Sequence, residues 1–105
     1  MNDEKIYEMI IERLKSIHEE LASQMYLSRY DKKEFASYKE CLDYIPEFID
    51  AYEHGLSYEF TVNILENYPA TLSGKNAIYL LELGLLMGFK TEADEDKIFN
   101  LHLND

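Results

Sequence analysis

The chain has 105 residues, and its 21 acidic and 10 basic side chains give a formal net charge of −11 at pH 7. Apolar residues make up 47% of the chain, enough to cover the inward faces of several helices in one domain spanning residues 1–105. The charge opposes direct binding to nucleic acid, and the single cysteine excludes an internal disulfide and fits a reducing compartment.

A long amphipathic helix is predicted at the N-terminus. Asn2 or Asp3 is placed to cap it, and acids occupy its first turn. The segment SRYDKK, residues 28–33, is expected to break this helix. The apolar residues that follow one another at intervals of three and four are Ile6, Ile10, Leu14, Ile17, Leu21 and Met25.

A second helical element is predicted from Asp31, because Asp31 and Glu34 have the spacing of a capping box. Pro46 leaves two alternatives open: one kinked helix, or a further helix with Pro46 in its first turn. We expect the element to end at His54, with Gly55 as the residue after the C-cap. Its apolar stripe consists of Tyr38, Cys41, Leu42, Ile45, Phe48, Ile49 and Tyr52.

Two further helices follow in the second half of the chain. Ser57 is predicted to cap the first, which ends before Pro69. The next begins near Ser73 and reaches Gly88; it is apolar almost all round, which predicts a central buried helix. The apolar residues of the first of these helices are Phe60, Ile64, Leu65 and Tyr68.

The chain ends in a predicted short helix that Thr91 caps and that carries Ile98, Leu101 and Leu103. No alternating run bounded by turn residues predicts a strand. We therefore expect an all-α fold, a single compact bundle of five to six helices.

Motifs that would indicate catalysis or metal binding are incomplete. The phosphate-loop-like LSGKNA has Asn76 after Lys75 where a Ser or Thr is required. HEEL at His18 lacks the second histidine of a zinc-binding helix, and Cys41 sits at core spacing with no histidine partner. We therefore predict no catalytic residue, no cofactor and no metal site, and a protein that is not an enzyme.

The acidic N-terminus MNDEKIYEMI lacks the basic and apolar regions of a signal peptide. The longest apolar run, residues 77–87, is too short to span a bilayer. We therefore expect a cytoplasmic protein that does not bind membranes.

The acidic charge is concentrated in the middle of the chain. Residues 1–39 carry eight acids and seven bases, residues 40–74 carry seven acids and no base, and residues 75–105 carry six acids and three bases. On a helical wheel most acids of the middle segment fall opposite the core stripe, with Tyr44 and Tyr58 as aromatic anchors, whereas Tyr52 and Tyr68 are expected in the core. The face is open to two interpretations, a solvated surface or a binding surface for a basic partner. The residues predicted to bind that partner are Glu40, Asp43, Tyr44, Glu47, Asp50, Glu53, His54, Tyr58, Glu59 and Glu66.

Residues 40–89, ECLDYIPEFIDAYEHGLSYEFTVNILENYPATLSGKNAIYLLELGLLMGF, resemble small helical immunity proteins of polymorphic bacterial toxins, of the MafI type and the contact-dependent growth inhibition (CdiI) type. Leu56 and Ser57 differ from that pattern, which has an acid after the glycine. The resemblance implies a stoichiometric inhibitor that binds a toxin domain, commonly a nuclease, and keeps substrate out of its active site. It is carried by Glu53, Gly55, Tyr58, Glu59, Leu65, Glu66, Met87 and Gly88.

The expected function is therefore that of an immunity protein whose acidic helical face occludes a cationic nuclease toxin. Two alternatives stay open: a phage-encoded acidic inhibitor of a host nuclease defence, and a homodimeric regulatory protein that pairs through an exposed apolar face. The expected partner is the toxin's C-terminal nuclease domain, with a monomer as the favoured oligomeric state of the free chain.

Overall fold

The computed structural model describes residues 3–91, and within this range it contains helices and connections but no strand. The all-α prediction is thus confirmed. Asn2 and the predicted last helix with Ile98, Leu101 and Leu103 lie outside the described residues. The helices are α1 (Asp3–Ala22), the 3-10 helix η1 (Met25–Tyr30), α2 (Tyr38–Asp50), α3 (His54–Asn67) and α4 (Gly74–Thr91).

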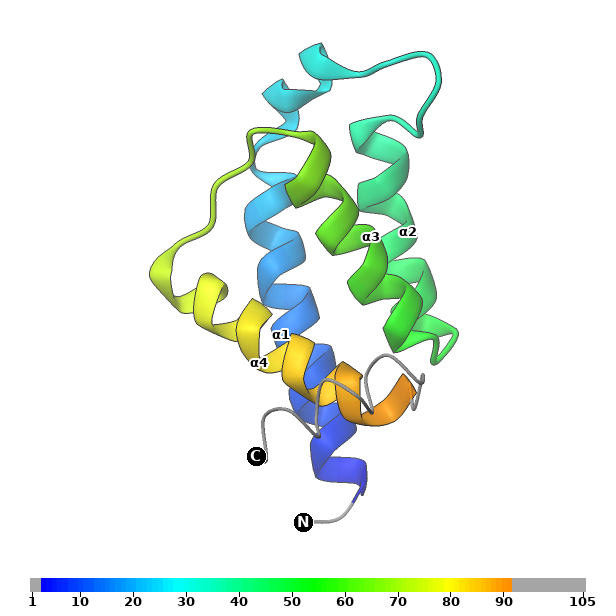
Figure 1. Cartoon of the computed structure of the whole chain (residues 1–105), viewed down its shortest axis with the longest axis vertical. Coiled ribbons are helices and arrows are strands. Elements are labelled where there is room, and N and C mark those ends of the chain that lie inside the picture. The colour runs from blue at the N-terminus through cyan, green and yellow to red at the C-terminus, as the bar shows by residue number, and fades with distance from the viewer. Residues whose placement is uncertain (1–2, 92–105) are drawn as a thin grey trace, which may run out of the picture.

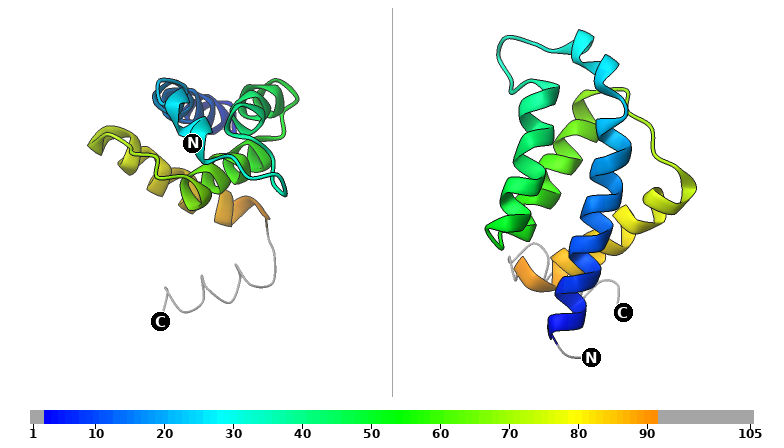
Figure 2. Two further views of the ribbon diagram at one scale, coloured as in Figure 1. Left: turned by 90° about the horizontal axis from the view of Figure 1, so that it is seen from above. Right: turned by 180° about the vertical axis from the view of Figure 1, so that it is seen from behind.

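The helices α2 and α3 form an antiparallel hairpin, and α1 packs along it (Figure 1). Helix α4 crosses α1 at a steep angle near the end of the bundle that contains the N-terminus (Figure 2). Among the described side chains, the buried apolar residues of α1 and α2 form most of the core, and α4 contributes Leu83 and Met87 to it.

The spacing predicted for α1 is confirmed, because Ile10, Leu14, Ile17 and Leu21 are all fully buried. The helix ends at Ala22, earlier than expected, and Met25 lies exposed in η1. Gln24, just after the helix, binds the backbone of Thr71: its Nε2 donates to the carbonyl at 2.8 Å and its Oε1 accepts from the N–H at 3.0 Å. These bonds fix the α3–α4 connection to the end of α1.

The predicted start of the second helix at Asp31 is wrong. Ser37 caps α2, accepting from the backbone N–H of Glu40 at 3.1 Å, a pair with the same capping-box spacing as Asp31 and Glu34. Asp31 instead lies in the loop before α2. Its Oδ1 accepts hydrogen bonds from the backbone N–H of Tyr38 at 2.8 Å and from the Tyr68 hydroxyl at 2.7 Å.

Helix α2 continues through Pro46, so of the two alternatives the single helix is found. It ends at Asp50, and the prediction that it reaches His54 with Gly55 behind it is wrong. Tyr52 adopts the left-handed conformation, with φ of 59°, and its N–H donates to Ile49 O at 3.1 Å while that of Glu53 donates to Phe48 O at 2.7 Å. These bonds form a Schellman motif with tyrosine where glycine is usual.

The predicted cap at Ser57 is also wrong, because α3 already begins at His54. Ser57 is fully buried inside the helix, and its hydroxyl donates to the Ile45 carbonyl of α2 at 2.9 Å. The predicted burial of Ile64 and Tyr68 is confirmed. A short side chain that bonds across the hairpin lets α2 and α3 approach closely here.

Helix α4 begins where predicted, and the Ser73 hydroxyl accepts from the Asn76 N–H at 3.3 Å. Its expected central position is wrong: Ile78, Leu81 and Leu85 are 58%, 71% and 59% exposed. The apolar periodicity of a helix does not show how many of its faces other elements will cover. Among the described helices, α1 and α3 are the ones that pack against α4.

Candidate functional site: an acidic face on the helical hairpin

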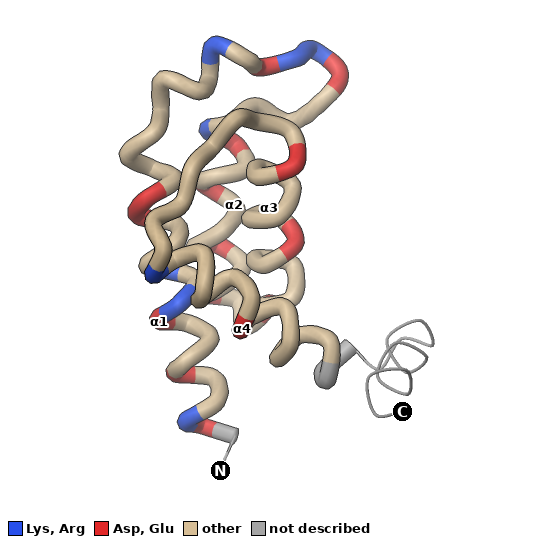
Figure 3. Tube along the Cα trace, turned by 60° about the vertical axis from the view of Figure 1, so that its left-hand side comes forward, with Lys and Arg blue, Asp and Glu red and all other residues tan. Residues whose placement is uncertain are grey.

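The hairpin of α2 and α3 exposes seven carboxylates, and we call the surface that they occupy the acidic face. In Figure 3 both helices carry acidic segments, and the basic residue at the start of α2 is followed by no other in the hairpin. All seven acids predicted from the sequence are exposed. The outward position that the helical wheel predicts is thus confirmed for Glu40, Asp43, Glu47, Asp50, Glu59 and Glu66. The acidic face consists of Glu40, Asp43, Glu47, Asp50, Glu53, Glu59 and Glu66.

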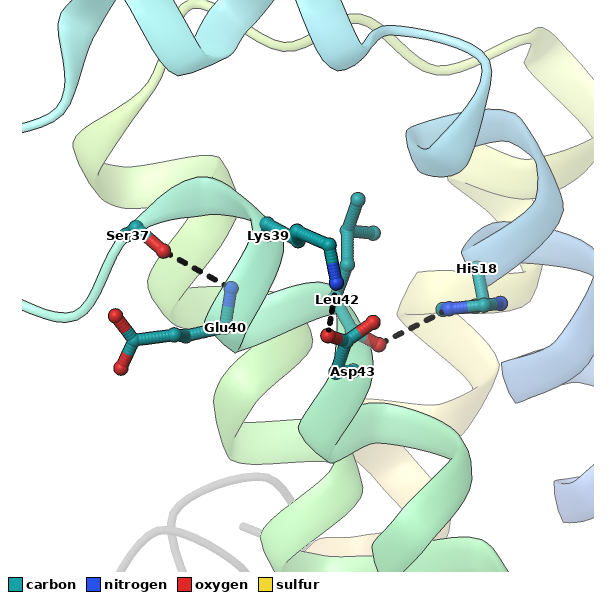
Figure 4. A network of polar contacts seen from close by, with 6 residues as sticks. All are labelled: His18, Ser37, Lys39, Glu40, Leu42 and Asp43. Atoms are coloured by element: carbon teal, nitrogen blue, oxygen red, sulfur yellow. Dashed lines mark hydrogen bonds and ion pairs between the residues drawn. The ribbon is translucent and has the colours of Figure 1, made fainter.

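One of these acids has an intramolecular counter-charge. Lys39 Nζ lies 2.8 Å from Asp43 Oδ2 one helical turn away (Figure 4), and this hydrogen bond raises the pKa of the lysine. Lys39 lies just before the base-free segment 40–74, and so Asp43 is paired although its own segment carries no base. Among residues 3–91 the other six acids form no ion pair. Their negative potential is left for solvent or a partner to balance.

Three aromatic rings join the two helices under the acidic face. The ring centroids of Tyr44 and Phe60 are 4.8 Å apart, and Phe48 lies 5.5 Å from Phe60 and 5.8 Å from Tyr44. All three side chains are half-buried. This aromatic seam fixes the acids of α2 relative to those of α3, so that a partner would meet a preformed surface.

Two of the predicted site residues turn away from this face. His54 is only 7% exposed and lies between the rings of Tyr7, at 5.6 Å, and Tyr52, at 6.2 Å, so its predicted place among the exposed acids is wrong. Tyr58 is half-buried, and its hydroxyl lies 3.0 Å from the position that a Cβ on Gly84 would take. Burial raises the pKa of Tyr58, which therefore stays a neutral contact between α3 and α4.

Tyr52, which the sequence placed in the core, is 82% exposed at the tip of the hairpin. It stands between Asp50 and Glu53 of the acidic face. The helical periodicity missed it because the stripe stays in phase up to Tyr52 while the helix itself ends at Asp50. An exposed aromatic ring beside carboxylates is the kind of side chain that often dominates the energy of a protein–protein interface.

Within the described residues, the acidic face has no reactive thiol beside it. Cys41 is fully buried, and burial raises the pKa of its thiol, so the thiolate needed for nucleophilic attack is disfavoured. Within the described range, no three His, Cys, Asp or Glu side chains are grouped so that they could hold a metal ion. What this surface offers chemically is an array of fixed anionic oxygens that can bind cationic side chains.

No helix among residues 3–91 combines the length and the apolar character that crossing a bilayer requires. Comparison of the chain with protein-family models, with curated proteins and with solved structures found no match.

Proposed function

We propose that this chain is an immunity protein that binds a bacterial toxin domain, a cationic nuclease, and neutralises it in the cytoplasm. The acidic face would cover the substrate site of the toxin. The observation that carries the proposal is the exposure of all seven carboxylates of one rigid hairpin, six of them without an ion pair in the described part of the chain. A nuclease must present cations to phosphate groups, and the same cations can bind carboxylates.

The arrangement of the acids within α2 supports an external counter-charge. Glu47 precedes Asp50 by three residues, and neither forms an ion pair within residues 3–91, so two uncompensated like charges are neighbours on the helix surface. Each such pair costs an isolated helix about 0.2 to 0.5 kcal/mol. A cationic partner would relieve this repulsion, and Tyr52 at the tip would add an apolar contact beside it.

The experiment that tests this function begins with the capture of partners. The tagged chain is used to pull down proteins from its native lysate at about 50 mM and about 500 mM salt. We expect a basic protein with nuclease activity that is released at high salt, because screening weakens exposed charge pairs. Addition of the purified chain to that protein should then stop nucleic-acid cleavage at a one-to-one ratio.

A pair of charge-reversal variants identifies the binding face. The first replaces Asp43, Glu47 and Asp50 with lysine, and the second replaces Glu8, Glu12 and Glu19, which are exposed on α1. Both variants change the net charge by the same amount. We expect the α2 variant to slow association with the captured nuclease about 10-fold or more, and the α1 variant to slow it much less, because steering depends on where the charge lies.

Circular dichroism of both variants should match that of the unchanged chain, since every replaced side chain is exposed. Equal slowing by the two variants would show that net charge and not this face controls binding. A captured partner without nuclease activity, or one whose activity persists at a molar excess of the chain, would contradict the proposed function.

A further inference from the structure

The outward side of α4 carries an apolar stripe made of Gly74, Ile78, Leu81, Leu85 and Gly88. Successive members are four, three, four and three residues apart, the spacing that keeps side chains on one helix face and forms the seam of paired helices. The three large members are 58%, 71% and 59% exposed. Leu83 and Met87 turn the opposite way and are buried. Within residues 3–91, other side chains thus cover the opposite side of α4 but leave the three large side chains of this stripe mostly exposed.

The stripe is nearly symmetric about Leu81. A large apolar residue follows on either side, Ile78 and Leu85, and a glycine closes each end. In a contact across a two-fold axis both copies contribute the same patch. The patch must therefore fit a second copy of itself that runs in the opposite direction. If two α4 helices cross antiparallel at Leu81, Ile78 of one copy falls near Leu85 of the other.

The two glycines leave room at the ends of such a pair. No atom within the described residues comes within 4 Å of the position that a Cβ would take on Gly74 or on Gly88. In an antiparallel arrangement Gly74 of one copy lies opposite Gly88 of the other. Because neither residue has a side chain, the helix ends do not hold the two backbones apart.

The low charge of α4 permits a second copy of the chain to approach this face. Residues 74–91 carry Lys75, Glu82 and Lys90, a net charge of +1, whereas residues 40–74 carry −7. Glu82 is already paired with Arg13 at 2.9 Å. Two copies of a chain with a net charge of −11 repel one another over most approaches, and α4 itself, with a small positive charge, adds little to this repulsion.

We propose that the α4 stripe is a two-fold homodimer interface in which two α4 helices pack antiparallel about Leu81. The acidic face belongs to the α2–α3 hairpin, so this inference does not depend on the proposed inhibition of a toxin. One helix face is smaller than the about 1,600 Å² buried in a standard protein interface, and we therefore expect a weak dimer that forms only at high protein concentration.

Sedimentation equilibrium of the full chain between about 1 μM and about 500 μM tests the proposal. The average mass should rise from 12.4 kDa toward twice that value. Leu81→Glu and Leu81→Lys should each stay monomeric, because like charges would meet at the axis. An equimolar mixture of the two variants should regain the dimer, since opposite charges then face each other.

The matched control is Phe35→Glu, because Phe35 is 62% exposed outside α4. This variant should dimerise like the unchanged chain, and circular dichroism should show that all variants are folded. A monomer at about 500 μM, equal loss of the dimer in the Phe35 variant, or no dimer in the mixed sample would each overturn the proposal. So would dimerisation only after removal of residues 92–105, which would identify that segment as the cover of the stripe. No toxin enters this experiment, so its failure leaves the proposed function untouched.

Discussion

His18 Nε2 of α1 donates a hydrogen bond to the backbone carbonyl of Leu42 in α2 at 3.0 Å (Figure 4). In an α-helix that carbonyl would accept from the N–H four residues later, but this residue is Pro46, which has none. A carbonyl oxygen only accepts, so the hydrogen is on Nε2. The histidine from α1 thus satisfies the acceptor that the proline leaves in α2.

Replacing His18 with Ala should lower the free energy of unfolding by about 1 to 2 kcal/mol, because the Leu42 carbonyl loses its donor. The loss should be about 1 kcal/mol smaller when Pro46 is also Ala, since residue 46 then supplies the helical N–H. Urea unfolding of the wild type, both single variants and the double variant measures this coupling. Additive losses would mean that the histidine contributes packing alone.

Tyr52 is held with a φ of 59°, a conformation that costs a residue with a side chain about 1 to 2 kcal/mol relative to glycine. Tyr52→Gly removes this cost but also increases the conformational entropy of the unfolded chain, which opposes folding. The net effect should be a rise of about 0.5 to 1 kcal/mol in the free energy of unfolding. Thermal and urea unfolding would measure the gain.

Tyr52→Ala provides the control, because alanine removes the ring but keeps the backbone cost. It should be no more stable than the wild type. If alanine and glycine stabilise the chain equally, the ring and not the backbone is the unfavourable element. The same two variants also test whether Tyr52 contributes to partner binding, because both remove the exposed ring from the tip of the hairpin.

The sequence predicted the parts of the fold that repeat over many residues. The spacing of Ile10, Leu14, Ile17 and Leu21 defines the buried face of α1 because four residues on successive turns follow the same periodicity. The end of α2 depends instead on one residue, Tyr52, in a conformation that tyrosine rarely adopts. No local signal predicts it, and Gly55 nearby offered a more usual stop.

The candidate site, too, was predicted from the sequence only in part. The acids of α2 are exposed as predicted, because a charged residue opposite an apolar stripe has one favourable position. His54 and Tyr58 were misplaced because their positions depend on where α3 begins and on what covers it. Leu81 on α4 is exposed because of the way the neighbouring helices pack. The periodicity of a single helix does not predict that packing.

Alkaline conditions should destabilise the chain through Tyr38. Its side chain is fully buried, the hydroxyl donates to Leu21 O at 2.7 Å, and burial raises its pKa to about 12. The pKa of this tyrosine is near 10 in the unfolded chain and about 12 in the folded one. The contribution of Tyr38 to the stability of the fold is therefore complete below pH 10 and is lost as the pH rises from 10 through about 12.

Tyr38→Phe should cost about 1 kcal/mol at neutral pH, because the Leu21 carbonyl loses its donor. The variant should, however, lose less stability than the wild type between about pH 8 and about pH 11. Urea midpoints at the two pH values give the comparison, and Tyr30→Phe, an exposed tyrosine, serves as the control. Equal alkaline losses in wild type and Tyr38→Phe would show that other tyrosines control this transition.

Acid should weaken the junction between α1 and α4 through Glu20. Its Oε1 accepts from Asn76 Nδ2 at 2.9 Å and from the Ser73 N–H at 2.8 Å, and these bonds lower the pKa of the carboxyl below 4.5, with Asn76 the largest cause. Because the pKa of Glu20 is lower in the folded chain than in the unfolded chain, its contribution to stability is complete above the pKa of the unfolded chain. That contribution is lost as the pH falls through the pKa of the folded chain.

Glu20→Gln should therefore reduce the free energy of unfolding by about 0.5 kcal/mol at neutral pH, a small value because solvent screens this part-exposed carboxylate. The difference from the wild type should shrink as the pH falls below about 4.5, since a protonated glutamate and a glutamine carry the same charge. Urea unfolding across this range measures the difference, and Glu19→Gln at an exposed neighbouring position is the control. A gap of constant size at about pH 3 would show that the hydrogen bonds do not depend on the charge of Glu20.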